Sequence, residues 1–292
     1  MSSKSTPITL TIAGSDSGGG AGIQADIKAI SATGGYACSV ITALTAQNTL
    51  GVDAIMSVEP NFVRAQLDSV FTDLDVRAVK IGMLSDTAII KCVAQALIEY
   101  QPPFIVLDPV MVATSGDVLL DQAAVQCLIT ELIPLATIIT PNLYEAQILL
   151  GRSSDTISKA IPKTNAQCNQ LAEDLMILNC QNVLLKGGHM ASSESVDIWY
   201  SREHGNQSFF AATFSASRID TKNTHGTGCT LSAAIASYLA QGRSLDVAIR
   251  LAKDYISRAI QASDKLEVGS GAGPVNHFYM LMDHDEMSNI DE

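Results

Sequence analysis

The sequence predicts an α/β fold in which helices cover both faces of a mostly parallel central sheet. Short apolar runs rich in β-branched residues alternate with longer stretches of helical period, and repeated strand–helix units of this kind pair their strands in parallel. In addition, Gly, Asn, Asp and Lys residues follow most of the strand-like runs. This is the pattern expected where ligands bind beyond the carboxyl ends of the strands.

The expected elements follow one another in a regular order. Strands are expected at residues 8–13, 38–46, 78–81, 104–107, 137–139 and 183–185, and helices at 22–33, 60–73, 87–100, 122–132, 142–150, 165–179, 227–240 and 245–262. Pro60 is typical of a helix start and Gly242 of a helix end. Residues 52–58 are expected to pair with 38–46 or to form an edge ribbon. Residues 196–200 and 209–214 predict a small β-hairpin near the sheet edge, with a turn at 204–206.

The chain is expected to form one domain over residues 1–292. Apolar residues make up 47% of the sequence, which is ample for a core, and no repeat or Pro/Gly-rich linker divides it. The polar stretch 151–163 is interpreted as a surface loop. Residues 1–7 and 281–292 are expected to be flexible termini.

Charge and composition exclude several classes of function. The net charge of −12 argues against a nucleic-acid partner and against an anionic membrane surface, because both require a basic face. The longest apolar runs fall far short of the roughly 20 residues that a membrane span requires. Six cysteines, none in a Cys-x-x-Cys pair, indicate a reduced, cytoplasmic protein.

The first expected strand is followed by a glycine-rich loop at 14–22. Residues 20–25 fit the G-x-G-x-x-A pattern, but residues 27–52 contain no acidic residue to hold a ribose, so a dinucleotide site is not supported. No Walker-type phosphate loop is present either. Five glycines in nine residues favour close approach of the backbone to a ligand over a plain turn.

The strongest local signal is the run 223–230, directly before a helix of small residues. Gly226 and Gly228 leave backbone N–H groups accessible at a helix N-terminus, which predicts an anion site. Cys229 falls in the first helical turn, where a thiolate is favoured, so its pKa is expected to be low. The alternative is that Cys229 has no functional role and simply packs as a small residue in the core. Lys222, just upstream, is expected to reach the same phosphate.

Three other strand ends carry polar groups. Asp108 is a candidate Mg²⁺ ligand through water. Asn142 and Glu145 lie three residues apart at a helix start, where they either serve a Mg²⁺–phosphate cluster or form a helix cap. Lys186 precedes two glycines and suits a phosphate neighbour. Together with the anion site, these residues point to phosphoryl transfer.

Several blocks then resemble one family in its own order along the chain. The blocks are residues 11–16, 19–26, 39–49, 80–84, 107–111, 140–145, 186–189, 224–230 and 273–278. They are similar to the hydroxymethylpyrimidine/phosphomethylpyrimidine kinases of thiamine biosynthesis. The resemblance implies a ribokinase-like fold and two ATP-dependent, Mg²⁺-assisted steps. The first phosphorylates 4-amino-5-hydroxymethyl-2-methylpyrimidine, and the second phosphorylates the resulting monophosphate.

The resemblance also implies roles for individual residues. Gln47 is expected to read the ring nitrogen and amino group of the pyrimidine, since an amide offers both a donor and an acceptor. Cys229 takes the place of the Asp that acts as general base in related sugar kinases. The remaining implied residues are Gly14, Asp26, Met83 and Val110 for the pyrimidine pocket, Gly226, Thr227 and Gly228 for catalysis, Asn142, Lys186, Lys222 and Thr224 for ATP and its phosphates, and Asp108 and Glu145 for the metal.

The sequence departs from the family pattern at three positions. It has Gly18 where Ser is usual, Thr114 where many members have Lys, and Ser270 where a basic residue is usual. The groups that neutralise the second phosphate are therefore left open.

Three alternatives are also left open. The nearest is a pyridoxal kinase of the same fold, since vitamin B6 presents a similar ring with a hydroxymethyl group. A ribokinase-type sugar kinase is disfavoured by Cys229. A non-catalytic pyrimidine or nucleotide sensor would bind its ligand without ATP turnover. Relatives are often dimers, so a homodimer is left open too.

Overall fold

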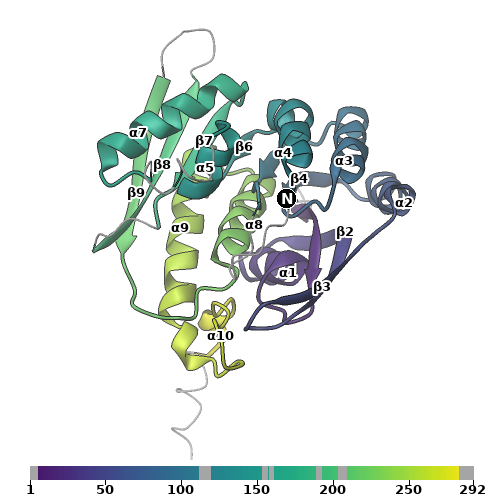
Figure 1. Ribbon diagram of the computed structural model, residues 1–292. Helices are drawn as coiled ribbons and strands as arrows, with labels where there is room; N and C mark the ends of the chain where they lie inside the picture. The colour runs from purple at the N-terminus through teal and green to yellow at the C-terminus, as the bar shows by residue number, and fades with distance from the viewer. Residues whose placement is uncertain are drawn as a thin grey trace, which may run out of the picture.

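The computed structural model describes residues 6–111, 120–152, 157, 161–188, 193–202 and 209–282. Its nine named strands form one sheet in the order β3-β2-β1-β4-β5-β6-β7-β8-β9 (Figure 1). The strands are β1 (Ile8–Asp16), β2 (Tyr36–Gln47), β3 (Val52–Ser57), β4 (Val76–Ile81), β5 (Ile105–Leu107), β6 (Ile138–Ile139), β7 (Asn182–Lys186), β8 (Glu194–Arg202) and β9 (Phe209–Ser217).

The centre of the sheet is parallel and its edges are antiparallel. Strands β2, β1, β4, β5, β6 and β7 pair in parallel. Strand β3 pairs antiparallel with β2 at one edge, and the β8–β9 hairpin continues antiparallel from β7 at the other. The mostly parallel sheet and the edge hairpin are thus confirmed. Residues 52–57 pair with β2, which was one of the two expected arrangements.

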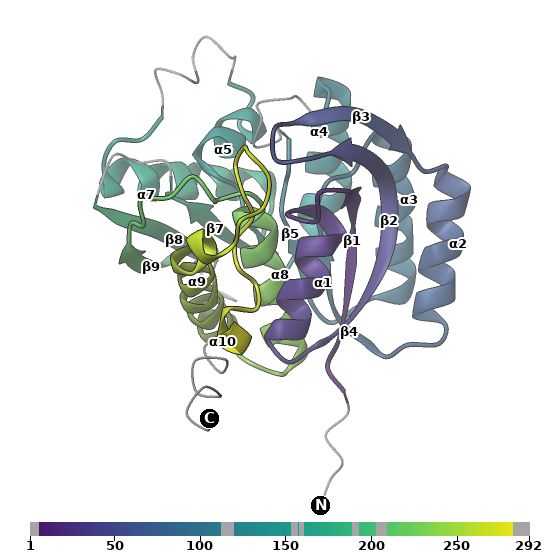
Figure 2. The same cartoon turned by 90° about the horizontal axis from the view of Figure 1, so that it is seen from below.

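Helices cover both faces of the sheet (Figures 1 and 2). One layer contains α1 (Gly22–Ala32), α8 (Thr227–Ala240) and α9 (Leu245–Gln261), in which α8 packs between the other two. The other elements are α2 (Pro60–Phe71), α3 (Thr87–Tyr100), α4 (Gln122–Cys127), the π-helical segment η1 (Leu128–Leu132), η2 (Ile133–Leu135), α5 (Leu143–Leu149), α7 (Asn165–Asp174), η3 (Leu175–Leu178), η4 (Ser263–Lys265) and α10 (Tyr279–Met282).

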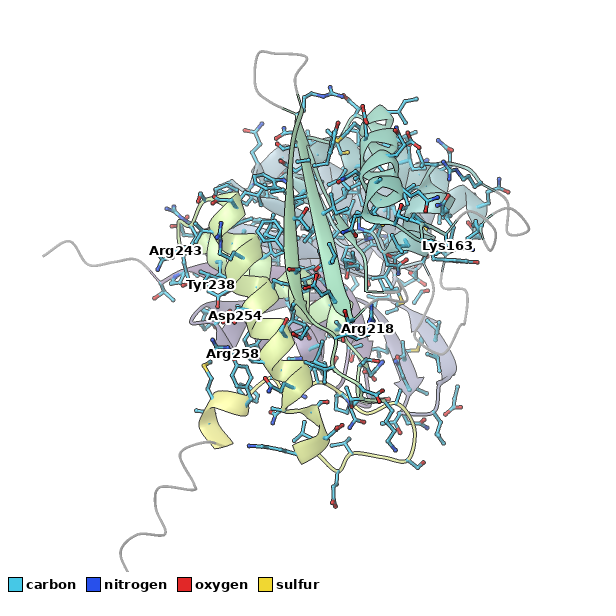
Figure 3. The ribbon with its side chains drawn as sticks, turned by 90° about the vertical axis from the view of Figure 1, so that its left-hand side faces the viewer. Lys163, Arg218, Tyr238, Arg243, Asp254 and Arg258 are labelled. Atoms are coloured by element: carbon cyan, nitrogen blue, oxygen red, sulfur yellow. The ribbon has the colours of Figure 1, made fainter. Side chains whose placement is uncertain are left out.

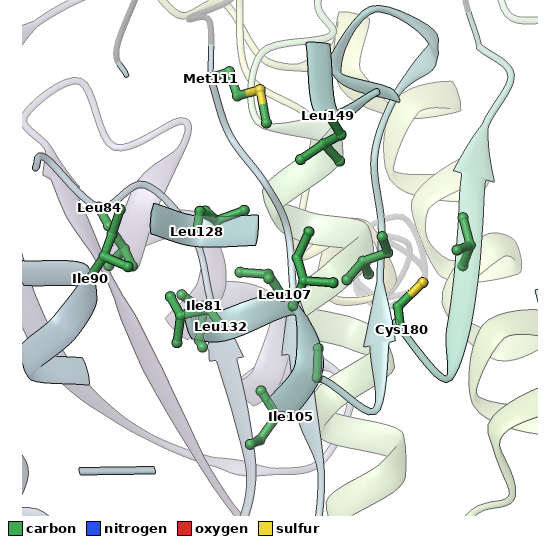
Figure 4. Packing of buried hydrophobic residues seen from close by; sticks show 14 of the residues in the cluster. Ile81, Leu84, Ile90, Ile105, Leu107, Met111, Leu128, Leu132, Leu149 and Cys180 are labelled. Atoms are coloured by element: carbon green, nitrogen blue, oxygen red, sulfur yellow. The ribbon is translucent and has the colours of Figure 1, made fainter. Parts of the chain in front are cut away.

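The two layers enclose separate apolar clusters, one on each face of the sheet. In the larger cluster, Ile81 and Leu107 at the ends of β4 and β5 pack with Leu128 and Leu132 of η1 (Figure 4). In the smaller cluster, small residues such as Ala233 and Ala236 bring α8 close to the strands. Both faces of the central strands are therefore buried, which explains why these strands read as continuous apolar runs.

Several expected boundaries differ from the structure, among them the following three. Strand β1 continues through Asp16 because Ser15 and Asp16 pair with β2 after a register shift at Gly14. The helix expected over 165–179 ends at Asp174 and continues as the tighter η3. Helix α10 extends to residue 282, so residues 281 and 282 are helical, whereas we expected them in a flexible terminus.

Some expectations fall outside the described residues. These are Thr114, His189, the turn at 204–206, and most of the two terminal segments. Within the described residues, no helix is both long and apolar enough to cross a membrane.

Candidate active site

A cavity of about 910 Å³ opens at the carboxyl ends of the parallel strands. Because these ends meet at one edge of the sheet, loops far apart in sequence line the same space. All but two of the site residues expected from the sequence line it: Gly14, Gln47, Met83, Asp108, Val110, Asn142, Glu145, Lys186, Thr224, Gly226, Thr227, Gly228 and Cys229. The two exceptions are Asp26 and Lys222.

One lobe of the cavity lies between the ends of β1, β2 and β4. Gly14 sits at the register shift of β1, where a Cβ atom would lie only 2.5 Å from the Met83 methyl group. A side chain at position 14 would therefore displace Met83 from the wall of the lobe. The half-buried side chain of Gln47, from the last residue of β2, supplies a polar amide to the same lobe.

Two residues that the sequence reasoning missed, Asp16 and His225, form a pair beside Gln47. The Asp16 carboxylate lies 3.1 Å from His225 Nε2. Asp16 also accepts backbone N–H bonds from Gly18, Gly20 and Ala21. Burial tends to raise the pKa of Asp16, but these bonds and His225 outweigh it and hold that pKa below its usual value. His225 lies within the 223–230 run, which was a signal that could have identified it.

The N-terminus of α8 faces the cavity without a side-chain cap. Its N-cap residue, Gly226, has φ +78°, and a Cβ atom there would lie 1.8 Å from the Gly20 carbonyl oxygen. Only glycine fits this close approach between the two glycine-containing loops. The N–H groups of the first helical turn have no intrahelical partners, so this end of α8 is suited to bind an anion.

Cys229 lies in the first turn of α8, but the expectation that its pKa is low is wrong. Burial is the largest effect and raises the pKa of the thiol to about 11. Asp26 and Asp108 act in the same direction, while Lys80 and the backbone N–H of Gly22 act to lower it. Desolvation of the thiolate thus outweighs the helix N-terminus.

Lys186, Asp108 and Glu145 form a charged cluster opposite α8. Lys186 Nζ lies 2.8 Å from Asp108 and 3.8 Å from Glu145. Asp108 also accepts hydrogen bonds from Thr140 and Ser232. Burial opposes ionisation of Asp108, but Lys186 and Lys80 lower its pKa. Burial, together with Asp108, raises the pKa of Glu145 to about 7.

The alternative of a helix cap at Asn142 and Glu145 is confirmed. The Asn142 side chain accepts N–H bonds from Tyr144 and Glu145, and Glu145 accepts the backbone N–H of Asn142 at 2.7 Å. This reciprocal capping box holds the Glu145 carboxylate at the start of α5, beside Lys186. Capping and a role in the cavity are therefore compatible.

The two exceptions occupy different surroundings. Asp26 lies on α1 and is completely buried, where it pairs with Lys80 and accepts a hydrogen bond from Thr11. Lys222 is exposed and is not part of the cavity wall.

A second lobe extends between the β8–β9 hairpin and α9. Its apolar wall contains Ile219, Leu231, Ile256 and Ile260. At its polar end, Lys253 Nζ donates to Asp197 at 2.8 Å and to Ser195 at 3.1 Å. Arg218 lies just beyond the end of β9 (Figure 3). It donates to the Gly188 carbonyl at 2.7 Å. Nothing in the local sequence pattern indicated this lobe, because only the hairpin's position in the sheet places it opposite α9.

Comparison with known proteins places the chain in a family. Residues 16–276 match the model of the family described as phosphomethylpyrimidine kinase. The chain belongs to the phosphomethylpyrimidine kinase family. It is 51% identical to the hydroxymethylpyrimidine/phosphomethylpyrimidine kinase of Rhizobium meliloti (strain 1021), over 94% of this chain and 98% of that protein. The family expected from the sequence blocks is thus confirmed.

Solved structures agree with this family and its fold. A phosphomethylpyrimidine kinase from Clostridium difficile 630 matches with a TM-score of 0.72 and 42% identity, over 87% of this chain and 99% of that one. A pyridoxal kinase from Bacillus subtilis, solved as an ADP complex, matches with a TM-score of 0.84 and 35% identity, over 95% of this chain and all of that one. The ribokinase-like fold shared by phosphomethylpyrimidine and pyridoxal kinases is therefore the fold of this chain.

Proposed function

We propose that the chain uses ATP to phosphorylate 4-amino-5-hydroxymethyl-2-methylpyrimidine and then its monophosphate, as in thiamine biosynthesis. The observation that carries this proposal is that the Gln47 amide, the Cys229 thiol and the N-terminus of α8 line one cavity. This arrangement brings together a group that can read a heterocycle, a thiol whose thiolate can accept a proton, and an anion site.

The pyrimidine is proposed to occupy the lobe bounded by Gly14, Met83 and Val110, with its ring edge on Gln47. ATP is proposed to place its base in the second lobe, against Ile219 and Ile256, so that its phosphates run past Lys186 to α8. The N–H groups of Gly226, Thr227 and Gly228 then stabilise the negative charge that develops on the transferred phosphoryl group. Asn142 and Thr224 are proposed to contact the phosphates from either side.

Mg²⁺ fits this site only in company with phosphate. Among the described residues, no group of three or more His, Cys, Asp or Glu side chains is arranged to hold a metal. Asp108 and Glu145 nevertheless supply two carboxylates beside Lys186. Mg²⁺ is commonly bound by one or two carboxylates together with substrate phosphates. We propose these two residues as its ligands, where the ion would neutralise charge on the phosphates.

The two steps place different demands on Cys229. In the first, the hydroxymethyl oxygen must lose its proton as it attacks. We propose that Cys229 receives it as the thiolate, which is the minor form of this side chain at neutral pH and is favoured by the charge of Lys80. In the second, the attacking phosphate oxygen is already anionic near neutral pH, since the second pKa of a phosphate ester is about 6. Cys229 is therefore needed as a base in the first step only.

The test is to count ADP released per pyrimidine with Mg-ATP, with pyridoxal assayed in parallel. Two ADP per pyrimidine support the double kinase, and one ADP restricts it to the first step. Turnover of pyridoxal alone would assign the chain to vitamin B6 phosphorylation, as in the B. subtilis protein named above. Tight pyrimidine binding without ADP release would make the chain a sensor.

We also propose a cytoplasmic location and a homodimer. The dimer proposal rests on the edge strand β3 and its neighbour β2, which expose Leu44, Ile55 and Met56. Sedimentation of the protein, compared with a Met56→Lys variant, tests it. A monomeric wild type, or a dimer that this variant leaves intact, argues against that edge.

A further inference from the structure

The Gln47 amide is surrounded by groups that determine which of its ends is the oxygen. One end faces His225 Nε2 at 3.3 Å, and the other faces Thr45 Oγ1 at 3.1 Å. An amide has a donor end and an acceptor end of nearly the same shape. The hydrogen bonds made by its neighbours therefore decide how the amide is turned.

His225 presents a donor to Gln47. Asp16 already accepts three backbone N–H bonds and is ionised at neutral pH, so it has no hydrogen to give. The bond between Asp16 and His225 Nε2 at 3.1 Å therefore requires the hydrogen to be on Nε2. The amide end that faces this nitrogen cannot be the NH2 group, because a protonated Nε2 has no lone pair to accept from it. It must be the carbonyl oxygen, which shares the single Nε2 hydrogen with Asp16.

Thr45 independently requires the same orientation of the Gln47 amide. Its hydroxyl has a single hydrogen, which it donates to the Ser15 carbonyl oxygen at 2.9 Å. Toward Gln47 it can therefore only accept. In the opposite orientation, with Nε2 toward His225 and Oε1 toward Thr45, an amide N–H would face the His225 N–H. The amide oxygen would also need a second hydrogen from the Thr45 hydroxyl, which has only one. A half-turn of the amide removes both conflicts.

We infer that Asp16, His225 and Thr45 lock the Gln47 amide in one orientation and so determine the pyrimidine that the site accepts. The inference rests on the proposed function. In the locked amide, the oxygen keeps one lone pair and the nitrogen keeps one N–H for a ligand. The ligand must therefore offer a donor and an acceptor side by side, in one fixed spatial order.

This order distinguishes a 4-aminopyrimidine from its 4-oxo counterpart. The 4-amino ring presents an exocyclic donor next to the acceptor N3, whereas the 4-oxo ring presents an acceptor next to N3–H. The ring cannot turn over to compensate, because its reacting hydroxymethyl group must stay toward Cys229. An amide that is free to rotate would pair with both rings. The locked amide instead places its acceptor against the 4-oxo oxygen and its donor against N3–H, so neither hydrogen bond can form.

The experiment compares kcat/KM for the 4-amino and 4-oxo forms of 5-hydroxymethyl-2-methylpyrimidine. We expect the wild type to favour the 4-amino form by about 100-fold or more, since sites that pair a polar group discriminate strongly against ligands that cannot pair it. Thr45→Val and His225→Phe each remove one lock while keeping most of the side-chain shape. In both variants, the preference should fall by about tenfold or more, mainly through gain of the 4-oxo compound.

Ser17→Ala is the matched control. Ser17 donates to the Gln47 carbonyl oxygen at 2.7 Å and accepts the Gln47 backbone N–H at 2.8 Å, so it holds the same residue without touching its amide. The preference should be unchanged in this variant. An unchanged preference in both Thr45→Val and His225→Phe would overturn the inference, even if their activities fall.

Dissociation constants of the two pyrimidines, measured by calorimetry, separate this inference from the proposed function. The same shift in preference is expected in binding, whether or not the ligand is phosphorylated. If the wild type binds the 4-amino form selectively but releases no ADP, the proposed kinase activity is wrong and the fixed orientation of the Gln47 amide is supported. If the wild type binds both forms equally, the lock fails whatever the activity.

Discussion

Lys80 Nζ lies 2.8 Å from Asp26 Oδ2, and both side chains are completely buried behind the cavity wall. Burial tends to lower the pKa of Lys80, but attraction to Asp26 and Asp108 outweighs it and raises that pKa. Lys80 is thus a fixed positive charge among acidic groups. Its charge favours the thiolate of Cys229.

Breaking this pair should destabilise the protein strongly. Lys80→Met leaves the Asp26 carboxyl buried without its charged partner, and we expect a loss of about 3–5 kcal/mol in the free energy of unfolding. Urea denaturation measures it. The double variant Lys80→Met/Asp26→Leu removes both charges and should recover most of that loss. A double variant as unstable as the single one would show that shape, rather than charge, matters at this position.

Cys229→Ser should separate the two proposed steps. The first step should slow by about 100-fold or more, the range typical of a lost general base. The second step should change much less, because its attacking oxygen is already anionic. Single-turnover assays started from the alcohol and from the monophosphate measure each step. Equal losses in both steps would favour a positional role for Cys229.

Gly226→Ala should abolish both steps, and Gly242→Ala provides its control. Both glycines have φ +78°, so alanine at either pays the cost of the left-handed conformation, about 1–2 kcal/mol. Only at Gly226 does the added Cβ meet a neighbouring carbonyl oxygen, at 1.8 Å, whereas nothing lies within 4 Å at Gly242. We expect Gly242→Ala to keep full ATP turnover. Comparable turnover in Gly226→Ala would rule out the tight approach as a requirement.

Glu145→Gln tests the proposed metal role apart from the helix cap. Glutamine preserves the capping box at the start of α5, so thermal stability should change little. Activity should fall by about 10- to 100-fold, and the Mg²⁺ concentration needed for half-maximal rate should rise. Asn142→Ala is the converse control, since it removes the cap and should cost about 1 kcal/mol of stability. An unaltered Mg²⁺ dependence in Glu145→Gln would remove Glu145 from the metal site.

The contribution of His277 to the stability of the protein should fall as the pH drops from about 6.5 to 4. Burial, aided by Lys28, lowers the pKa of His277 from 6.5 to about 4. The unfolded chain therefore binds a proton in this window that the folded chain does not, so the contribution of His277 is complete above pH 6.5 and lost below pH 4. The shift corresponds to about 3 kcal/mol. Urea titrations of the wild type and of His277→Gln measure it as a difference between the two proteins, because Glu145, whose pKa is raised to about 7, titrates in the same range with the opposite sign.

Much of the fold follows from local patterns in the sequence. Helix α3 spans Thr87–Tyr100 as expected, because Asp86 caps its first N–H groups and the apolar period continues until the left-handed residue Gln101. The central strands were recognisable because both of their faces are buried. The boundaries that differed, at Asp16 and Asp174, depend on pairing with β2 and on a change of helical hydrogen bonding, which no local pattern encodes.

The candidate site was only partly predictable. Residues at strand ends, such as Asp108 and Lys186, were found because parallel strands bring those ends together. Asp26 does not line the cavity, because the face of α1 on which it lies packs against Lys80. His225 was overlooked because its partner, Asp16, lies 209 residues away in sequence.

By itself, the sequence determined the element types, the parallel sheet and the chemical groups at the strand ends, because these depend on periodicity, turn residues and spacing. Only the tertiary structure decided the protonation and orientation of those groups. Cys229 has a raised pKa because burial outweighs the helix N-terminus, and the Gln47 amide is turned by Thr45 and His225. Both effects arise from desolvation and hydrogen bonding between distant segments, and these exist only once the chain has folded.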